Sequence, residues 1–221
     1  MVEITRLVNT WFTSNTYILA HPQYDTVWVI DPGDVKPIVD WIIDHKKLSI
    51  SGILLTHAHF DHIYGINDIL NVHPDCVIYT ANNYGKMLLF DAKKNASKYS
   101  DLGSIEIDKK AHITYYNHTL SLWPDIMMTV HLTPGHSPDS VCLQVENKMF
   151  TGDTLIKDTR TVTKLKGGST EQLKASFILI SSFKGLSYAI YPGHDDIFGL
   201  DDYDLTKATR KAYNSCKQKT I

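Results

Sequence analysis

The heptapeptide Thr56-His57-Ala58-His59-Phe60-Asp61-His62 comes directly after a short apolar run, Gly52-Ile53-Leu54-Leu55. Four potential metal ligands therefore lie within six residues, at the end of a predicted buried strand. Because a strand projects alternate side chains to the same side, His57 and His59 are able to reach one metal ion. The chain must then turn, which brings Asp61 and His62 toward a second position. Nitrogen and oxygen donors of this kind suit zinc, with iron or manganese as alternatives.

The composition is that of a folded protein without a strong charge. The chain has 221 residues, a formal net charge of −2 and 43% hydrophobic residues. This is enough apolar material for a sizeable core, and the length fits one large domain or two small ones. We predict a single domain over residues 1–221. The near-neutral charge gives no reason to expect a nucleic-acid or membrane partner.

Cysteine usage indicates the compartment. Cys76, Cys142 and Cys216 are odd in number, form no Cys-x-x-Cys pair and lie away from the histidine cluster. This argues against a disulfide framework and fits a reducing compartment. No signal peptide is evident at residues 1–6, and no apolar stretch reaches transmembrane length. These features predict a soluble, cytoplasmic protein.

Strand and helix patterns alternate along the chain, which is typical of an α/β fold. Predicted strands cover residues 4–20 (one or two strands), 26–30, 52–55, 76–79, 119–122, 126–132, 140–146, 149–151 and 188–191. Predicted helices cover residues 36–47, 64–72, 81–100, 170–183 and 205–217. Residues 91–95 are a candidate break in the third helix, and Ser169 or Thr170 is the expected N-cap of the fourth.

Three later residues follow the same pattern as the first cluster. His136, Asp153 and His194 each come after a predicted strand, and a glycine stands directly before each of them. Glycine permits a backbone path that aims the next side chain into a site. We therefore predict that these three residues join the cluster around His57 in one metal-binding site.

With these motifs together, the chain resembles the metallo-β-lactamase superfamily, and within it the glyoxalase II-like hydrolases. The resemblance runs from Asn15-Thr16-Tyr17 through Ile30-Asp31-Pro32-Gly33 to Pro192-Gly193-His194. The His-x-His-x-Asp-His motif with downstream His, Asp and His is highly specific for this superfamily and much less specific for a substrate. The resemblance implies a four-layer αββα sandwich with two metals at one edge, between the sheets.

The resemblance also implies roles for individual residues. The first metal would be held by His57, His59 and His136. The second would be held by Asp61, His62 and His194, and Asp153 would bridge the two. Two zinc ions are expected, with iron or manganese as alternatives, at a separation of about 3.5–4 Å. Such a pair lowers the pKa of bound water toward about 7, so that metal-bound hydroxide attacks a carbonyl.

Several neighbours of the ligands are assigned supporting roles in the same way. Asp61 is also a catalytic candidate that orients the nucleophile or passes a proton. Thr56, Asp31 and Ser137 are either partners of the ligands or turn and cap residues. Arg160 and Tyr191 are candidate substrate contacts, since a basic loop can meet a carboxylate or phosphate.

The residues around Asp153 separate members of the superfamily. Lactamases typically lack the bridging Asp, which argues against β-lactam hydrolysis. Lactonases carry a Tyr shortly after it, whereas Leu155-Ile156-Lys157-Asp158 follows here. Persulfide dioxygenases use a single iron and a Gly-Arg-Thr-Asp run, from which Lys157-Asp158-Thr159-Arg160-Thr161 departs. Full-length glyoxalase II adds a helical C-terminal domain that helps to hold glutathione, but only 27 residues follow His194.

We therefore expect a binuclear zinc hydrolase that cleaves an acyl thioester. The thiol carrier is either glutathione or a phosphopantetheine arm, so that the partner is a small molecule or an acyl carrier protein. The alternatives are a mononuclear iron persulfide dioxygenase and a lactonase-type hydrolase. A catalytically silent binding module is a further reading, but the complete set of seven ligands argues against it.

Overall fold

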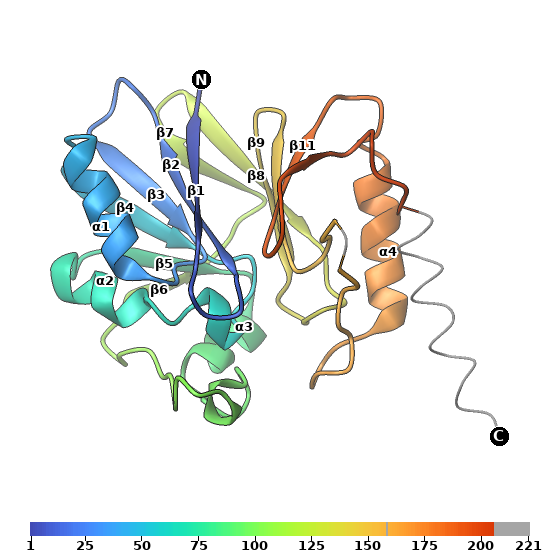
Figure 1. Ribbon diagram of the computed structural model, residues 1–221, viewed down its shortest axis with the longest axis horizontal. Coiled ribbons are helices and arrows are strands. Elements are labelled where there is room, and N and C mark those ends of the chain that lie inside the picture. Colours follow the sequence, from blue (N-terminus) through green and yellow to red (C-terminus); the bar gives the residue numbers. More distant parts are fainter. Residues whose placement is uncertain (158, 206–221) are drawn as a thin grey trace.

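Two six-stranded sheets pack face to face in the computed structural model, which describes residues 1–157 and 159–205 (Figure 1). The first sheet has its strands in chain order: β1 (Glu3–Val8), β2 (Asn15–Ala20), β3 (Thr26–Ile30), β4 (Ser49–Leu54), β5 (Val77–Thr80) and β6 (Ile113–Tyr115). The second has the order β12 (Phe198–Gly199), β11 (Ala189–Pro192), β10 (Lys148–Gly152), β9 (Val141–Val145), β8 (Ile126–Leu132) and β7 (Thr119–Trp123).

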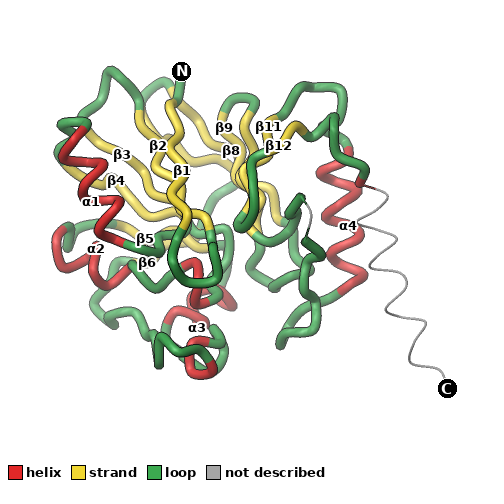
Figure 2. The backbone as a smooth tube through the Cα atoms, in the orientation of Figure 1, coloured by secondary structure: helices red, strands yellow, loops and turns green. Residues whose placement is uncertain are grey.

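Helices cover the outer face of each sheet (Figures 1 and 2). On the first sheet these are α1 (Val35–Asp44), α2 (Ile66–Val72) and α3 (Asn83–Leu89), whose apolar side chains pack on those of the strands. On the second sheet α4 (Thr170–Ser181) does the same. A separate core fills the space between the sheets and contains Tyr17, Leu54, Val130 and Phe150. The predicted four-layer αββα sandwich is therefore confirmed.

Parallel strand pairs bring distant parts of the chain to one edge. Strands β3 and β4 are parallel, with Ile30 paired to Leu54, so the segments that follow them leave the sheet side by side. Strands β10 and β11 are also parallel, with Gly152 paired to Pro192. The carboxyl ends of parallel strands lie at the same edge of a sheet, which is where α/β folds place their sites.

Most predicted elements are present, with some differences in extent. The expected helix over residues 81–100 ends at Leu89, because Asp91 then accepts the backbone N–H groups of Lys93 and Lys94 in a turn. Strands β6 and β12 were not predicted. Two short 3₁₀ turns complete the elements, at Phe60–His62 and Ser97–Tyr99.

The N-cap of α4 is Ser169, whose hydroxyl accepts the backbone N–H of Gln172. The helix predicted over residues 205–217 lies outside the described residues, apart from its first position. Among residues 1–157 and 159–205, no helix is both long enough and apolar enough to cross a lipid bilayer.

Candidate metal centre

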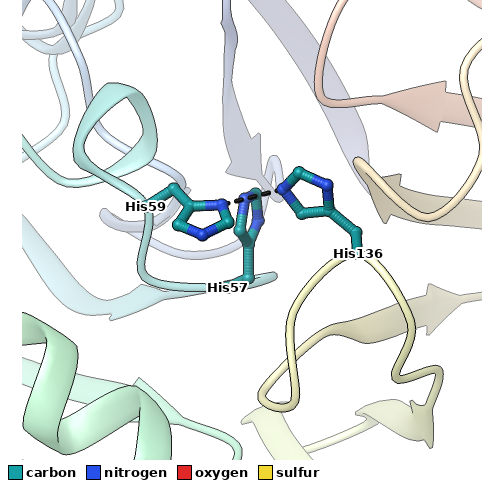
Figure 3. A group of neighbouring side chains, drawn as sticks. All are labelled: His57, His59 and His136. Carbon is teal, nitrogen blue, oxygen red and sulfur yellow. Dashed lines mark hydrogen bonds between the residues drawn. The ribbon is translucent and has the colours of Figure 1, made fainter. Parts of the chain in front are cut away.

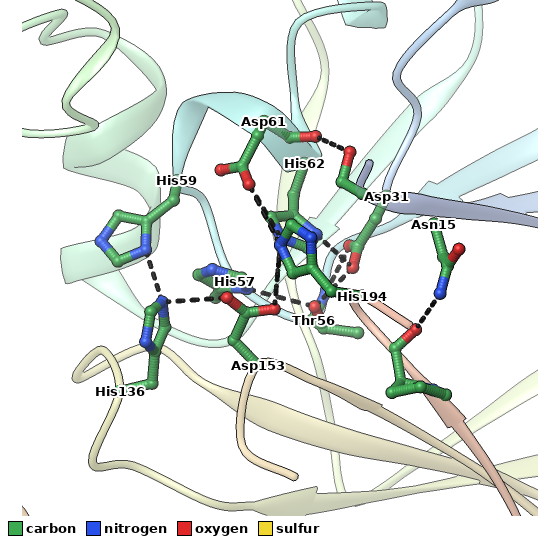
Figure 4. A network of polar contacts seen from close by, with 12 residues as sticks. Asn15, Asp31, Thr56, His57, His59, Asp61, His62, His136, Asp153 and His194 are labelled. Atoms are coloured by element: carbon green, nitrogen blue, oxygen red, sulfur yellow. Dashed lines mark hydrogen bonds and ion pairs between the residues drawn. The ribbon is translucent and has the colours of Figure 1, made fainter. Parts of the chain in front are cut away.

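The seven side chains predicted as ligands lie together at one edge of the two sheets (Figure 4). Four come from the segment after β4, where the 3₁₀ turn at Phe60–His62 carries two of them. The others follow β8, β10 and β11, so both sheets contribute. The predicted ligands are His57, His59, Asp61, His62, His136, Asp153 and His194.

A first group, called here the first triad, consists of His57, His59 and His136 (Figure 3). One nitrogen atom of each ring lies within 4.8 Å of those of the other two. The closest pair is His59 Nδ1 and His136 Nε2, at 2.8 Å. All three side chains are buried, so this is a pocket of nitrogen donors shielded from water.

A second group, the second triad, consists of Asp61, His62 and His194. The Oδ2 atom of Asp61 lies 3.2 Å from His194 Nε2 and 3.6 Å from His62 Nε2. His62 is fully buried, whereas the side chains of Asp61 and His194 are 13% and 17% exposed. The second triad therefore forms the more open side of the site.

The Asp153 carboxylate lies between the two triads, as Figure 4 shows. Its Oδ1 atom is 3.5 Å from Nε2 of both His62 and His194. Its Oδ2 atom is 3.6 Å from His136 Nε2. One oxygen thus faces each triad, which is the arrangement that a carboxylate bridging two cations requires.

Three buried polar atoms of this site have no hydrogen-bond partner among the described residues. They are His57 Nε2, His62 Nε2 and Asp153 Oδ1. Leaving such groups unpaired costs free energy, so native proteins rarely do so without an ion or water at the position. Divalent cations would satisfy all three atoms at once. The residues therefore fit a metal centre, and their nitrogen and oxygen donors suit zinc, iron or manganese.

The charge states of His57, His59 and Asp153 agree with that fit, whereas the Asp61 and Asp153 carboxylates outweigh burial and raise the pKa of His62 and His194. Burial lowers the pKa of His57 well below its usual value and that of His59 to about 3, so both rings are neutral at pH 7. Burial alone would raise the pKa of Asp153, but the neighbouring His194 and His62 outweigh it and lower this pKa well below its usual value. Neutral imidazole and ionised carboxylate are the forms that bind metals.

Comparison with known proteins places this arrangement in a family. A sequence model of the Metallo-beta-lactamase superfamily matches residues 9–194. The chain belongs to this superfamily. A hydroxyacylglutathione hydrolase of Pseudoalteromonas translucida (strain TAC 125) is 31% identical over 74% of this chain. The chain covers only 55% of that relative, little more than half of its length.

Two other proteins match over more of their own length. The probable metallo-hydrolase YqgX of Bacillus subtilis (strain 168) is 35% identical over 74% of this chain and 76% of its own. The crystal structure of the BLEG-1 B3 metallo-beta-lactamase superimposes with a TM-score of 0.79 at 26% identity. That superposition covers 89% of this chain and 94% of the other.

Asp31 holds one histidine of each triad, His62 directly and His57 through the Thr56 hydroxyl. Its Oδ2 atom lies 3.0 Å from His62 Nδ1 and accepts the Thr56 hydroxyl at 2.5 Å. Since that hydroxyl donates to Asp31, its oxygen is left to accept from His57 Nδ1, 3.3 Å away. Both Nε2 atoms then point into the site, because the other ring nitrogen is engaged. From the sequence, Asp31 and Thr56 are either partners of the ligands or turn and cap residues. The structure shows their contacts with the ligand histidines.

Backbone carbonyl groups hold two further histidines. His136 Nδ1 lies 2.8 Å from the Val162 carbonyl oxygen, and His194 Nδ1 lies 2.9 Å from that of Phe12. Neither carbonyl could be assigned from the sequence, because any residue supplies one and only the fold selects it. These contacts fix the ring orientation in the same way as Asp31 does.

Glycine is required where the strand ends approach the ligands. At Gly193, a Cβ atom would lie 2.3 Å from Asp153 Oδ1 and 2.9 Å from His62 Cε1. At Gly152, whose φ is +48°, a Cβ atom would lie 2.3 Å from Thr56 Oγ1. The glycines preceding Asp153 and His194 therefore permit close approach as well as the turn itself.

The two candidate substrate contacts lie in different surroundings. Tyr191 is half-buried between the sheets, with ring centroids 5.6 Å from Tyr17 and 5.0 Å from Phe150. Arg160 is exposed on the connection after Asp153. Their contact with a substrate stays a prediction, as do the individual ligand assignments.

Proposed function

We propose that this chain is a two-zinc hydrolase of acyl thioesters. The observation that carries the proposal is Asp153, which stands between two triads with one carboxylate oxygen toward each. Persulfide dioxygenases have similar ligands but use a single iron, which would leave one of these two triads without a metal. The geometry therefore favours two metals and hydrolysis.

The relatives support the thioester class of substrate. A relative at 31% identity is a hydroxyacylglutathione hydrolase, a name that describes cleavage of an acyl group from glutathione. We propose a glutathione thioester as the first substrate to test and a thioester on a phosphopantetheine arm as the second. The small molecule or the carrier protein would be the only partner that the reaction needs.

The residues divide the work of such a reaction. The first triad would hold one metal, the second triad the other, and Asp153 both. When bound, the metals would lower the pKa of a bound water and polarise the scissile carbonyl. Asp61 lies on the more open side of the site, where its carboxylate is able to orient the attacking water and take up a proton. The buried first triad keeps bulk water away from the far side of the centre.

A substrate panel on one metal-free preparation tests this proposal. The protein is reconstituted separately with zinc, iron(II) and manganese(II), and metal content is measured each time. The panel contains S-D-lactoylglutathione, an acyl-N-acetylcysteamine thioester, an acyl-homoserine lactone, a β-lactam and glutathione persulfide. We expect thioester cleavage by the zinc form that disappears with a chelator and returns with zinc.

Other outcomes of this panel contradict the proposal in distinguishable ways. One iron per chain with oxygen uptake on the persulfide would indicate a dioxygenase. Faster cleavage of the lactone or the lactam than of either thioester would indicate another hydrolase of the superfamily.

We also propose a cytoplasmic location, since Cys76 and Cys142 are buried free thiols, and cell fractionation tests it.

A further inference from the structure

Asp139 connects the segments that carry the first triad. It lies in the loop between β8 and β9, three residues after His136, and is only 1% exposed. One carboxylate oxygen accepts the Ser137 hydroxyl of the same loop. The other, Oδ2, accepts the backbone N–H of Ala58 at 2.9 Å. Ala58 stands between the other two histidines of the triad, so a single side chain ties all three ligand positions together.

The surroundings hold this carboxylate firmly and without a counter-charge. At Gly85 of α3, a Cβ atom would lie 2.8 Å from Asp139 Oδ2, so the helix packs directly on it. No Lys or Arg within residues 1–157 and 159–205 forms an ion pair with it. Burial raises the pKa of this carboxyl above its usual value, so its hydrogen bonds to Ser137 and Ala58, and not an ion pair, hold it. The bond to Ala58 reaches outside the loop, which indicates a role beyond closing the loop.

The two triads suggest what that role is. The second triad has its own carboxylate, Asp61, and Asp31 stands behind it. The first triad consists of imidazoles alone, and it shares only Asp153. Asp31 Oδ1 accepts the N–H of the residue before His57, at 2.8 Å, and Asp139 accepts the N–H of the residue after it. Two buried carboxylates thus hold the backbone on either side of this ligand.

We propose that Asp139 is a positioning residue for the first metal site, which holds Ala58, and with it His57 and His59, in place relative to His136. The inference rests on the proposed two-metal centre. Outer partners of metal ligands typically change metal affinity by about 10–100-fold when removed. The effect here falls on one site of the two, because the Asp139 contacts described above lead to the first triad and not to the second.

Calorimetric zinc titration of the metal-free protein tests this inference. His59→Ala and His194→Ala first assign the two binding steps to the two sites. We expect Asp139→Ala to weaken the step that His59→Ala removes by about 10–100-fold and to leave the other step unchanged. Asp139→Asn restores most of the affinity, because its amide oxygen accepts the Ala58 N–H while its NH₂ group faces Ser137. Ser137→Ala gives a smaller loss at the same step and serves if Asp139→Ala does not fold.

Asp201→Ala is the control, since the exposed Asp201 holds a loop away from the triads by accepting the backbone N–H groups of Gly185 and Ser187. It is expected to lower stability and to leave both zinc steps intact. The inference is overturned if Asp139→Ala leaves both steps unchanged, weakens both equally, or is not rescued by Asn. Wild-type protein that takes up no zinc overturns the two-metal centre together with this inference, whereas two normal steps in all Asp139 variants overturn the inference alone.

Discussion

The histidine side chains of this site are constrained at both ring nitrogens. Each histidine of the centre presents one nitrogen to it, and the other nitrogen of four rings contacts a hydroxyl, a carboxylate or a backbone carbonyl. The sequence predicts the ligand candidates because metals accept few types of donor and these donors are closely spaced. The sequence does not predict the groups that hold these ligands in place. Asp139, for example, is an ordinary loop residue in the sequence, and only the fold brings Ala58 to it.

Asp153→Asn tests the bridging position. The amide carries no charge, so it is a poorer partner for two cations than the carboxylate is. We expect zinc content to fall from about two to about one per chain. Zinc affinity should also drop by more than the loss of about 10–100-fold that is typical when a residue holding a metal ligand is removed. Elemental analysis and initial rates on a thioester check this. Asp125→Asn, in the turn between β7 and β8, is the control, and a variant with two zincs at the wild-type rate contradicts the assignment.

Asp31→Asn tests the support behind both triads. Asn tolerates the left-handed backbone at this position, where φ is +50°, so the turn itself is kept. Its NH₂ group then meets two donors that the carboxylate accepted, which costs about 1–3 kcal/mol. We expect lower stability in urea unfolding and zinc affinity reduced by about 10–100-fold. Asp34→Asn in the same turn, whose partners are Thr10 and Tyr64, should leave zinc affinity unchanged. Unchanged affinity in Asp31→Asn would remove this role.

Strands and helices position the site through the ends of parallel pairs. The sequence predicts β3, β4, β10 and β11 because each is a short apolar run followed by a turn. It does not predict β6 and β12, which have only three and two residues. Strand β6 takes its place from the distant β5, with Ile113 paired to Ile78, and β12 pairs with the preceding strand β11. Helix α3 ends early because Asp91 offers the backbone an alternative to helical hydrogen bonds, as side chains of this type do.

Gly193→Ala tests the close approach of β10 and β11. The added methyl group would lie 2.3 Å from Asp153 Oδ1, so this carboxylate or the strand end must shift. We expect a loss of about 1–3 kcal/mol of stability, as for other overpacked sites, together with weaker zinc binding. At Gly199, by contrast, the nearest obstacle is the exposed side chain of Asp202, so Gly199→Ala is the control. A fully stable Gly193→Ala protein with normal zinc content would contradict the geometry.

At the scale of the whole molecule, the metal centre lies where the two sheets meet and takes ligands from both. The sheets also share a core of aliphatic and aromatic side chains, so the site does not hold them together alone. The family resemblance of the sequence predicts the layer order, and the motifs at the strand ends predict that the seven ligand candidates share one site. It did not predict which outer groups hold them, since those contacts join residues up to 182 positions apart.

Metal removal is therefore expected to lower stability without unfolding the protein. Cations bound only by the folded chain stabilise it by about 2.7 kcal/mol per site at a free concentration 100-fold above Kd. The thermal midpoint should fall on chelation and recover with zinc, and scanning calorimetry measures both. In Asp153→Asn, the difference in thermal midpoint between the zinc-bound and the metal-free protein should be smaller. An identical midpoint with and without zinc would show that the folded chain does not bind it.

The most direct test of the two-metal centre is the zinc content per chain, by elemental analysis after reconstitution and desalting. We predict about two zincs in the wild-type protein and about one in each of His59→Ala and His194→Ala. One zinc or none in the wild-type protein, or two in either variant, would contradict it.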